Sequence, residues 1–197
     1  MENKENSTKV VIGEVRFSYL HVFEPWKPDD NSREQYTATL LIPKSDTATV
    51  EKVKNAIKAA FEKAVVDKWG GKRPVKWFNP LQDGDQPKDN GDDRGESYHG
   101  CWYLNAKSGS RPGVVDVKRQ PILNSEDIWS GCYGYASIAF GGFTYGGKTG
   151  SGNMGISCYL NNLLMSRKGE ALGSGKTSAE EDFKDLPFGG ETDESLF

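Results

Sequence analysis

Residues 129–164 read WSGCYGYASIAFGGFTYGGKTGSGNMGISCYLNNLL, and this stretch decides the fold. Two strand-like runs, Gly131–Tyr145 and Met154–Leu164, are separated by Gly, Ser, Thr and Asn, which is typical of a β-hairpin. In the first run one face of the period-two pattern suits a core: Cys132, Gly134, Ala136, Ile138 and Phe140. The other face carries Tyr133 and Tyr135 between small residues. These rings could stack on unpaired bases or cap a second core layer, and the hairpin alone favours the core.

The composition is that of one β-rich domain with a flexible appendage. The chain has 197 residues, 23 glycines and 11% aromatic residues, which is unlike a helical bundle. No apolar run approaches the length of a membrane span, and Met1–Lys9 lacks the apolar core of a signal peptide, so we expect a soluble, cytoplasmic protein. Three widely spaced cysteines contain no CxxC pair and are expected to be reduced and buried: Cys101, Cys132 and Cys158. A metal site joining them to His99 is disfavoured.

The rest of the pattern predicts four further strands and one helix. The strands are Lys9–Phe23, Glu34–Ile42, Tyr98–Lys107 and Gly113–Arg119. In the first, Gly13 is a bulge site, Val11, Val15, Phe17 and Tyr19 share one face, and Glu14, Arg16 and Ser18 share the other. An amphipathic helix begins after a cap at Asp46 or Thr47 and ends at Gly70-Gly71. The expected fold is mainly β, an OB-fold-like Greek-key barrel of five or more antiparallel strands, with a β-sandwich as the alternative.

Residues Asn79–Glu96 form a long polar loop with six acids and two bases. Its aspartates do not match the spacing of a calcium-binding loop, so a mobile loop is the favoured interpretation. An acidic loop is unfavourable beside DNA, and we expect it to face away from any such surface.

One motif suggests an enzyme but lacks the context that it needs. Residues 142–149 match the phosphate-binding pattern G-x-x-x-x-G-K-[ST]. That loop works by opening a helix, whereas turn-forming residues and a strand-like run follow here. The chain has two histidines, His21 and His99, and no nucleophile elbow or paired-carboxylate motif. We therefore expect no enzymatic activity and no cofactor.

Bases and aromatic residues are interleaved along the predicted strands and loops. Cations that follow phosphates and rings that stack on bases are how proteins hold single-stranded nucleic acid without sequence preference. The candidate contacts are Arg16, Trp26, Lys27, Arg73, Lys76, Trp77, Tyr103, Lys107, Arg111, Lys118, Tyr133, Tyr135 and Lys148. Each of them taken singly also fits an ordinary surface cation or core ring; Trp102 and Trp129 are assigned to the core.

The C-terminal segment has a different character from the body. Residues Ser178–Phe197 carry seven acids and one lysine, so a mildly basic body bears a strongly acidic tail. We divide the chain into a domain at 1–172 and a flexible tail at 173–197. The tail ends in Asp193, Glu194, Ser195, Leu196 and Phe197. This tip suits an apolar pocket rimmed by bases on a partner, and the acids could also occupy the protein's own cationic surface.

Several segments of the chain, together with this tail, resemble phage-encoded single-stranded-DNA-binding proteins. They are residues 111–116 (RPGVVD), 130–134 (SGCYG), Gly155-Ile156, 160–162 (LNN) and 177–180 (TSAE). The resemblance implies an OB-fold body that binds single-stranded DNA (ssDNA) during phage replication and recombination, often as a dimer, in the host cytoplasm. It also implies that the tail contacts replication enzymes. It gives no list of contact residues.

The sequence thus predicts a non-enzymatic protein that binds and protects ssDNA in phage DNA replication, recombination and repair. Its tail would compete with DNA and recruit partners through Leu196 and Phe197. The alternative is a structural or assembly β-protein whose tail makes only protein contacts.

Overall fold

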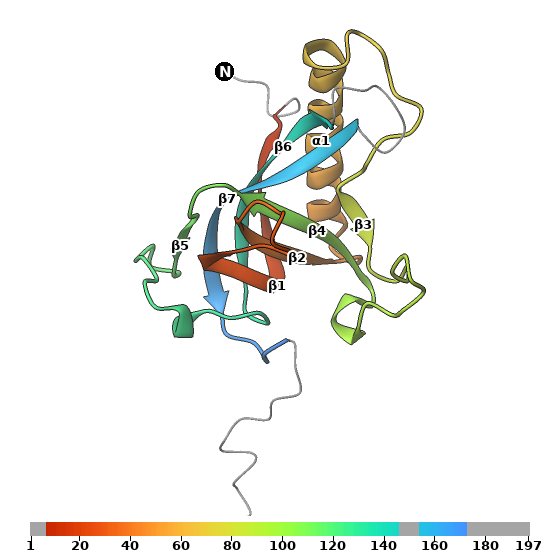
Figure 1. Cartoon of the computed structure of the whole chain (residues 1–197). Coiled ribbons are helices and arrows are strands. Elements are labelled where there is room, and N and C mark those ends of the chain that lie inside the picture. The colour runs from red at the N-terminus through yellow and green to blue at the C-terminus, as the bar shows by residue number, and fades with distance from the viewer. Residues whose placement is uncertain (1–6, 146–153, 173–197) are drawn as a thin grey trace, which may run out of the picture.

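A β-barrel of five strands forms the centre of the computed structural model, which describes residues 7–145 and 154–172 (Figure 1). The barrel strands are β1 (Lys9–Trp26), β2 (Gln35–Pro43), β4 (Cys101–Ser108), β6 (Tyr133–Thr144) and β7 (Met154–Arg167). They pair in the order β1-β2-β4-β7-β6 and back to β1. Only the pair of β4 with β7 is parallel, among these five. This closed Greek-key barrel confirms the predicted OB-like fold class.

Two short strands and two 3-10 turns complete the sheet and its connections. Strand β3 (Leu81–Asp83) pairs with β4, and β5 (Gly113–Val115) pairs with β7. The turns are η2 (Glu96–Tyr98) and η3 (Ser125–Asp127). The predicted strand Gly113–Arg119 is therefore too long, because the backbone turns after Val115 and the Asp116 carboxylate accepts hydrogen bonds from the amides of Lys118 and Gln120.

Strand β1 contains three register shifts, between Ile12 and Val15, between Ser18 and His21, and between His21 and Trp26, and they change which side chains face the core. The register against β6 shifts between Ile12 and Val15, which confirms the predicted bulge at Gly13. A second shift, against β2, falls between Ser18 and His21, where Tyr19 has a φ of 44°. Each shift inverts the alternation of side chains. The predicted face is therefore wrong at its two ends: Val15 and Phe17 are buried, whereas Val11 and Tyr19 are exposed.

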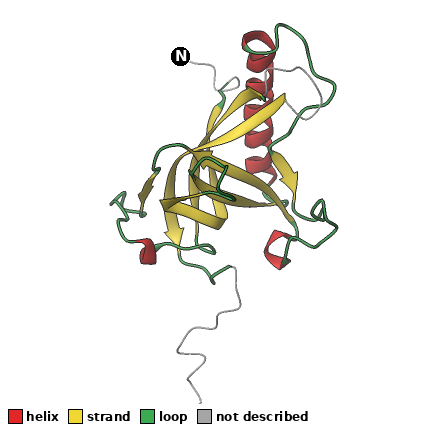
Figure 2. Cartoon of the chain, viewed as in Figure 1, coloured by secondary structure: helices red, strands yellow, loops and turns green. Residues whose placement is uncertain are grey.

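Helix α1 (Thr47–Asp67) packs against one end of the barrel, mainly on β6 and β1 (Figure 2). The Asp46 carboxylate accepts a hydrogen bond from the Thr49 amide, which confirms one of the two predicted caps. Its buried face is apolar: Val50, Val53, Ala56, Ile57, Ala60, Ala64 and Val65. Gly70 and Gly71 have φ values of 60° and 77°, a conformation that glycine adopts without strain, so they end the helix as expected. No helix in the described ranges is long and apolar enough to cross a membrane.

The hairpin of β6 and β7 forms the centre of the core. The expected inward face is confirmed, because Cys132, Ala136, Ile138 and Phe140 are buried. The three cysteines are free, as predicted; Cys132 and Cys158 are buried and Cys101 is half-buried. Burial raises the pKa of the Cys158 thiol, which keeps it protonated and unreactive. Residues 142–144 of the phosphate-loop match lie within strand β6, and the rest of the match, apart from Tyr145, lies outside the described residues.

Candidate nucleic-acid interface

The outer face of β1, β2 and β4 carries three rows of cross-strand neighbours. Strand register places Arg16 beside Leu41 and Tyr103, Ser18 beside Thr39 and Asn105, and His21 beside Thr37 and Lys107. Thr39 donates a hydrogen bond to the Asn105 side chain over 2.8 Å. The middle row is therefore polar and uncharged, and it lies between rows that carry Arg16 and Lys107.

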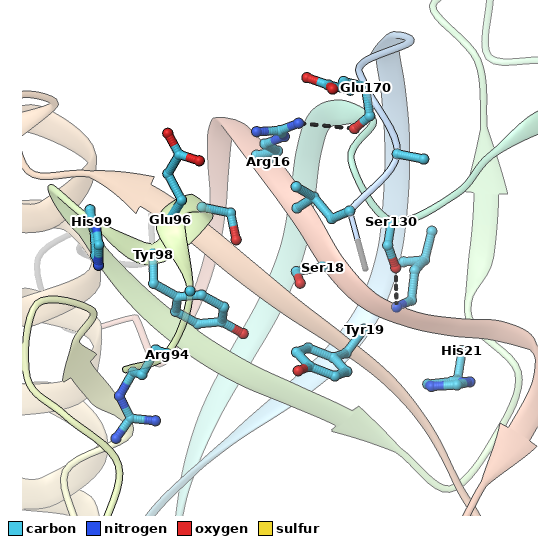
Figure 3. Close-up of a pocket in the computed structure, with 15 residues that line it drawn as sticks. Arg16, Ser18, Tyr19, His21, Arg94, Glu96, Tyr98, His99, Ser130 and Glu170 are labelled. Carbon is cyan, nitrogen blue, oxygen red and sulfur yellow. Dashed lines mark hydrogen bonds between the residues drawn. The ribbon is translucent and has the colours of Figure 1, made fainter. Parts of the chain in front are cut away.

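Two adjoining pockets lie over this face. The larger, about 1050 Å³, lies between β1, the loop around η2 and the segment that follows β7 (Figure 3). The second, about 420 Å³, lies over β1, β2 and β4. Both are lined by Tyr19, His21, Arg94 and Tyr98, so they form one continuous surface, which we call the barrel groove.

Aromatic rings are exposed along the barrel groove. Tyr19 and Trp26 have exposed fractions of 61% and 47%. The Trp26 ring stacks on His21, with 5.5 Å between ring centroids and 17° between planes. Figure 3 shows the Tyr19 and Tyr98 side chains near each other among the residues that line the larger pocket, with their hydroxyl ends toward one another. Burial raises the pKa of the Tyr98 hydroxyl, while hydrogen bonding to Ser18 and Thr39 opposes the shift, so Tyr98 is neutral at physiological pH.

Four cationic side chains line the same surface: Arg16, Lys88, Arg94 and Lys107. Arg16 donates to the Glu170 carbonyl oxygen over 2.9 Å (Figure 3), and Arg94 donates to the Gln86 carbonyl oxygen over 2.9 Å. Hydrogen bonding to carbonyls fixes both guanidinium groups while leaving their charge uncancelled. Glu96 and Glu170 also line the larger pocket, so the groove is not uniformly positive.

The acidic loop borders the barrel groove, so the expectation that it faces away is wrong. Its aspartates are largely paired with bases. Lys44 contacts Asp83 and Asp85 at 2.5 and 2.6 Å, and Asp93 contacts His99 at 3.0 Å. These contacts lower the pKa of each aspartate. Three of the loop's six acids are therefore paired with bases, and the loop contributes Lys88, Arg94 and Glu96 to the lining of the groove.

The residues predicted to contact DNA lie in several different parts of the protein. Arg16, Trp26, Tyr103 and Lys107 lie at the barrel groove. Tyr103, however, is only 5% exposed, because the loop covers it with Arg94 at 5.1 Å from its ring. A base therefore has little access to the Tyr103 ring.

Tyr133 and Tyr135 lie on the outer face of β6, as their alternation predicted. Tyr133 is half-buried, with the guanidinium carbons of Arg167 and Arg16 at 3.5 and 5.4 Å from its ring. It therefore neighbours Arg16 but does not line either pocket of the barrel groove. Tyr135 is exposed, and its ring lies against Gly13.

Other candidates lie away from the groove. Trp77 packs on Phe61 of α1 at 4.9 Å, and Arg73 pairs with Glu62 of the same helix. Lys27 pairs with Asp30 at 3.3 Å, and Arg111 lies 4.9 Å from the Phe23 ring. Lys76 and Lys118 are exposed, the latter in the turn after β5. Lys148 and the tail residues Asp193, Glu194, Leu196 and Phe197 lie outside the described residues.

Sequence reasoning missed part of the groove. The period-two pattern placed Tyr19 on one face with Val11, Val15 and Phe17, and it gave no reason to choose His21, Lys88, Arg94, Thr37 or Asn105 as contacts. Residues 21–26 (HVFEPW) contain His21, Phe23 and Trp26 close together, and this clustering of rings could have indicated the His21–Trp26 stack. Nothing local in the sequence indicates that Arg94 returns to the barrel.

The segment that leads to the tail is attached at the edge of the groove. The Leu172 amide donates to the Ser130 carbonyl oxygen over 2.7 Å, and the Trp129 indole donates to the Gly169 carbonyl oxygen over 2.9 Å. The Leu172 side chain packs against a small buried cluster formed by Leu41, Tyr98 and Tyr103. The tail therefore begins at the lip of the larger pocket.

A closed OB-like barrel with exposed rings on β1 and cations on β1, β4 and the adjoining loop has the features of an oligonucleotide-binding protein. The comparisons with known proteins agree. Residues 8–196 match the family model described as "Enterobacter phage Enc34, ssDNA-binding protein", and the chain belongs to this family. This confirms the resemblance seen in the sequence.

One relative and several solved structures are similar over most of the chain. "Putative protein p50" of Acyrthosiphon pisum secondary endosymbiont phage 1 is 32% identical over 188 residues, which are 90% of this chain and 94% of the relative. The ssDNA-binding protein of bacteriophage Enc34 superposes with a TM-score of 0.65 at 20% identity, covering 94% of this chain and 97% of that one.

The same phage protein in complex with ssDNA gives a TM-score of 0.63 at 22% identity, over 88% and 97% of the two chains. The ssDNA-binding protein gp2.5 of bacteriophage T7 gives 0.55 at 15% identity, over 93% and 98%. At these identities the structures establish a shared fold.

Proposed function

We propose that this protein binds ssDNA without sequence preference, and that the barrel groove is the binding surface. The carrying observation is that exposed Tyr19 and Trp26 lie on one face with Arg16, Arg94 and Lys107. Membership of a family described as ssDNA-binding, and the fold shared with a phage protein solved in complex with ssDNA, support the proposal.

The groove supplies the two interactions that such binding requires. Bases stack on the Tyr19 ring and on the Trp26 ring that His21 supports, at about 1–3 kcal/mol for each base. Phosphates lie near Arg16, Arg94 and Lys107, and the release of counterions from the DNA drives this part of the binding. Every base has a face that can stack, so this mode favours no sequence.

The path of the strand follows the groove from Trp26 to Arg16, and Tyr133, which neighbours Arg16, extends this path at the β6 side. Contacts at Tyr135, Lys27 and Arg111, which do not line the groove, stay predictions. So do contacts at Arg73, Lys76, Trp77, Lys118 and Lys148, which lie away from it or outside the described residues.

The acidic tail acts on the same surface in this proposal. Its attachment at Glu170–Leu172 beside Arg16 supports the idea, because the acidic segment 178–197 follows this anchor closely in the sequence. The tail competes with DNA at low salt, and its tip recruits partner proteins during replication, recombination and repair of phage DNA.

A binding titration with charge-reversal variants tests the groove. Removing one cation that neutralises a phosphate of a single strand weakens binding about fivefold at 0.1 M salt. Arg94→Glu and Lys107→Glu should each weaken binding to fluorescent oligo-dT by at least that factor. Lys52→Glu, an exposed lysine on α1, is the matched control. Equal affinities for all three variants and the unmodified protein would overturn the assignment.

A gel shift with single- and double-stranded oligonucleotides addresses the alternative, a structural β-protein. The proposal predicts a shift with the single strand. The alternative predicts a shift with neither.

A further inference from the structure

A third pocket, separate from the two of the barrel groove, lies between α1, β3 and β4, which stand side by side in Figure 1. It has a volume of about 450 Å³. Its walls are apolar and aromatic: Ile57, Phe61, Trp77, Leu81 and Trp102. We call it the helix pocket. It shares no lining residue with either pocket of the barrel groove.

The rim of the helix pocket is cationic. Lys54 and Lys58 lie on its α1 side, and both are exposed. The Lys54 ammonium lies 5.7 Å from the Trp102 ring centroid. Neither lysine takes part in an ion pair within residues 7–145 and 154–172. The pocket is therefore suited to an apolar side chain flanked by carboxylates.

The chain contains a segment with this chemistry. Residues 193–197 read DESLF, in which two acids precede a leucine and a phenylalanine. Leu196 and Phe197 match the apolar walls, and Asp193 and Glu194 match the lysine rim. We propose that the tip of this chain's own tail, Asp193–Phe197, docks in the helix pocket.

The length of the tail permits this contact. Leu172 is anchored to the barrel, and Asp193 follows it by 21 residues. A flexible chain of that length has a root-mean-square span of about 25 Å and a maximum reach of about 70 Å. A domain of this size has a radius of gyration of about 16 Å, so the tip reaches the helix pocket.

Tethering makes a weak contact sufficient. A flexible linker of this kind gives an effective concentration on the order of 1 mM. A tip that binds with a dissociation constant of about 0.1 mM would therefore be docked about 90% of the time. Docking at the helix pocket occupies Leu196 and Phe197, so a partner that binds the same tip must displace it.

The chain's tryptophans provide the test in the full-length protein, without DNA. Trp77 and Trp102 line the helix pocket, and Trp26 lies in the barrel groove. The indole N–H groups of Trp69 and Trp129 donate to the carbonyl oxygens of Phe143 and Gly169 and serve as internal references. The five indole resonances are recorded on ¹⁵N-labelled protein and assigned by single Trp→Phe substitutions.

We expect the double substitution Leu196→Ser and Phe197→Ser to shift the indole resonances of Trp77 and Trp102 and to leave those of Trp26, Trp69 and Trp129 in place. In the Lys54→Glu and Lys58→Glu double variant, the same tail substitution should produce less than a third of that shift. Lys52→Glu is the matched control, because it lies on a different side of α1, and it should leave the full shift. The three lysines replaced here, Lys52, Lys54 and Lys58, are all exposed, so these charge changes remove no buried side chain.

Three results would overturn the proposal. The first is unchanged Trp77 and Trp102 resonances in the tail variant. The second is a shift confined to Trp26, which would place the tip in the barrel groove. The third is a shift that disappears on dilution, which would assign the contact to a second copy of the chain. A failure of DNA binding leaves this test unaffected, because no DNA is present.

Discussion

Substitutions of Tyr19 allow its effect on the stability of the protein to be measured separately from its proposed role in binding ssDNA. Its φ of 44° is a left-handed conformation, which costs any residue other than glycine about 1–2 kcal/mol. Glycine adopts this conformation freely but loses about 0.5–1 kcal/mol through its greater freedom in the unfolded chain. Tyr19→Gly should therefore be more stable than Tyr19→Ala by about 0.5–1 kcal/mol. Both variants lack the same ring, so their comparison isolates the backbone term.

Both variants should bind oligo-dT more weakly than the unmodified protein, and by the same factor. The loss of one stacked base is worth about 1–3 kcal/mol, which is about 5- to 150-fold in affinity. Urea unfolding measures the stability difference, and fluorescence anisotropy measures binding. Tyr145→Ala removes an exposed ring outside the groove and is the control. Unchanged affinity in both Tyr19 variants would refute the stacking role, and a Gly variant less stable than the Ala variant would refute the backbone argument.

Three further predictions concern charge. Lys107→Ala should lower the slope of log affinity against log salt by about 0.7, whereas Lys52→Ala should not; equal slopes would contradict a phosphate contact at Lys107. Deleting Glu180–Phe197 should strengthen ssDNA binding at low salt, and the gain should disappear near 1 M salt, where charges are screened; a gain independent of salt would argue against electrostatic competition. The Asp93 carboxylate raises the pKa of His99 above 6.5, so the stabilisation from this pair is complete below pH 6.5 and is lost as the pH rises through the raised value. NMR titration of the His99 ring should show that pKa falling toward 6.5 in Asp93→Asn; no change would show that another group is responsible.

The period-two and helical patterns of the sequence predicted the parts of the barrel whose structure depends on packing against the core. The inward face of β6, the cap at Asp46 and the end of α1 at Gly70 follow directly from local sequence. They are predictable because a buried face tolerates only small or apolar side chains, and because a helix end needs a side-chain acceptor or a glycine.

The site was harder to predict because it depends on irregular backbone and on contacts distant in sequence. The register shift in β1 after Ser18 separates Tyr19 from the buried residues Val15 and Phe17, with which the period-two pattern had grouped it. The loop that carries Arg94 folds back over Tyr103 and buries a ring that the sequence analysis had named as a candidate contact. Trp77 follows a basic segment, yet it packs on Phe61 of α1. No periodicity within one segment reports these tertiary contacts.

The most direct test of the central claim is a map of the amides that respond to ssDNA. Unlabelled oligo-dT is titrated into ¹⁵N-labelled full-length protein, and the amide chemical shifts are followed. The account predicts that the largest shifts fall on Tyr19, Thr37, Arg94 and Lys107, with residues 52–63 of α1 unaffected. Shifts that concentrate on α1 while Tyr19 and Lys107 stay unchanged would contradict it.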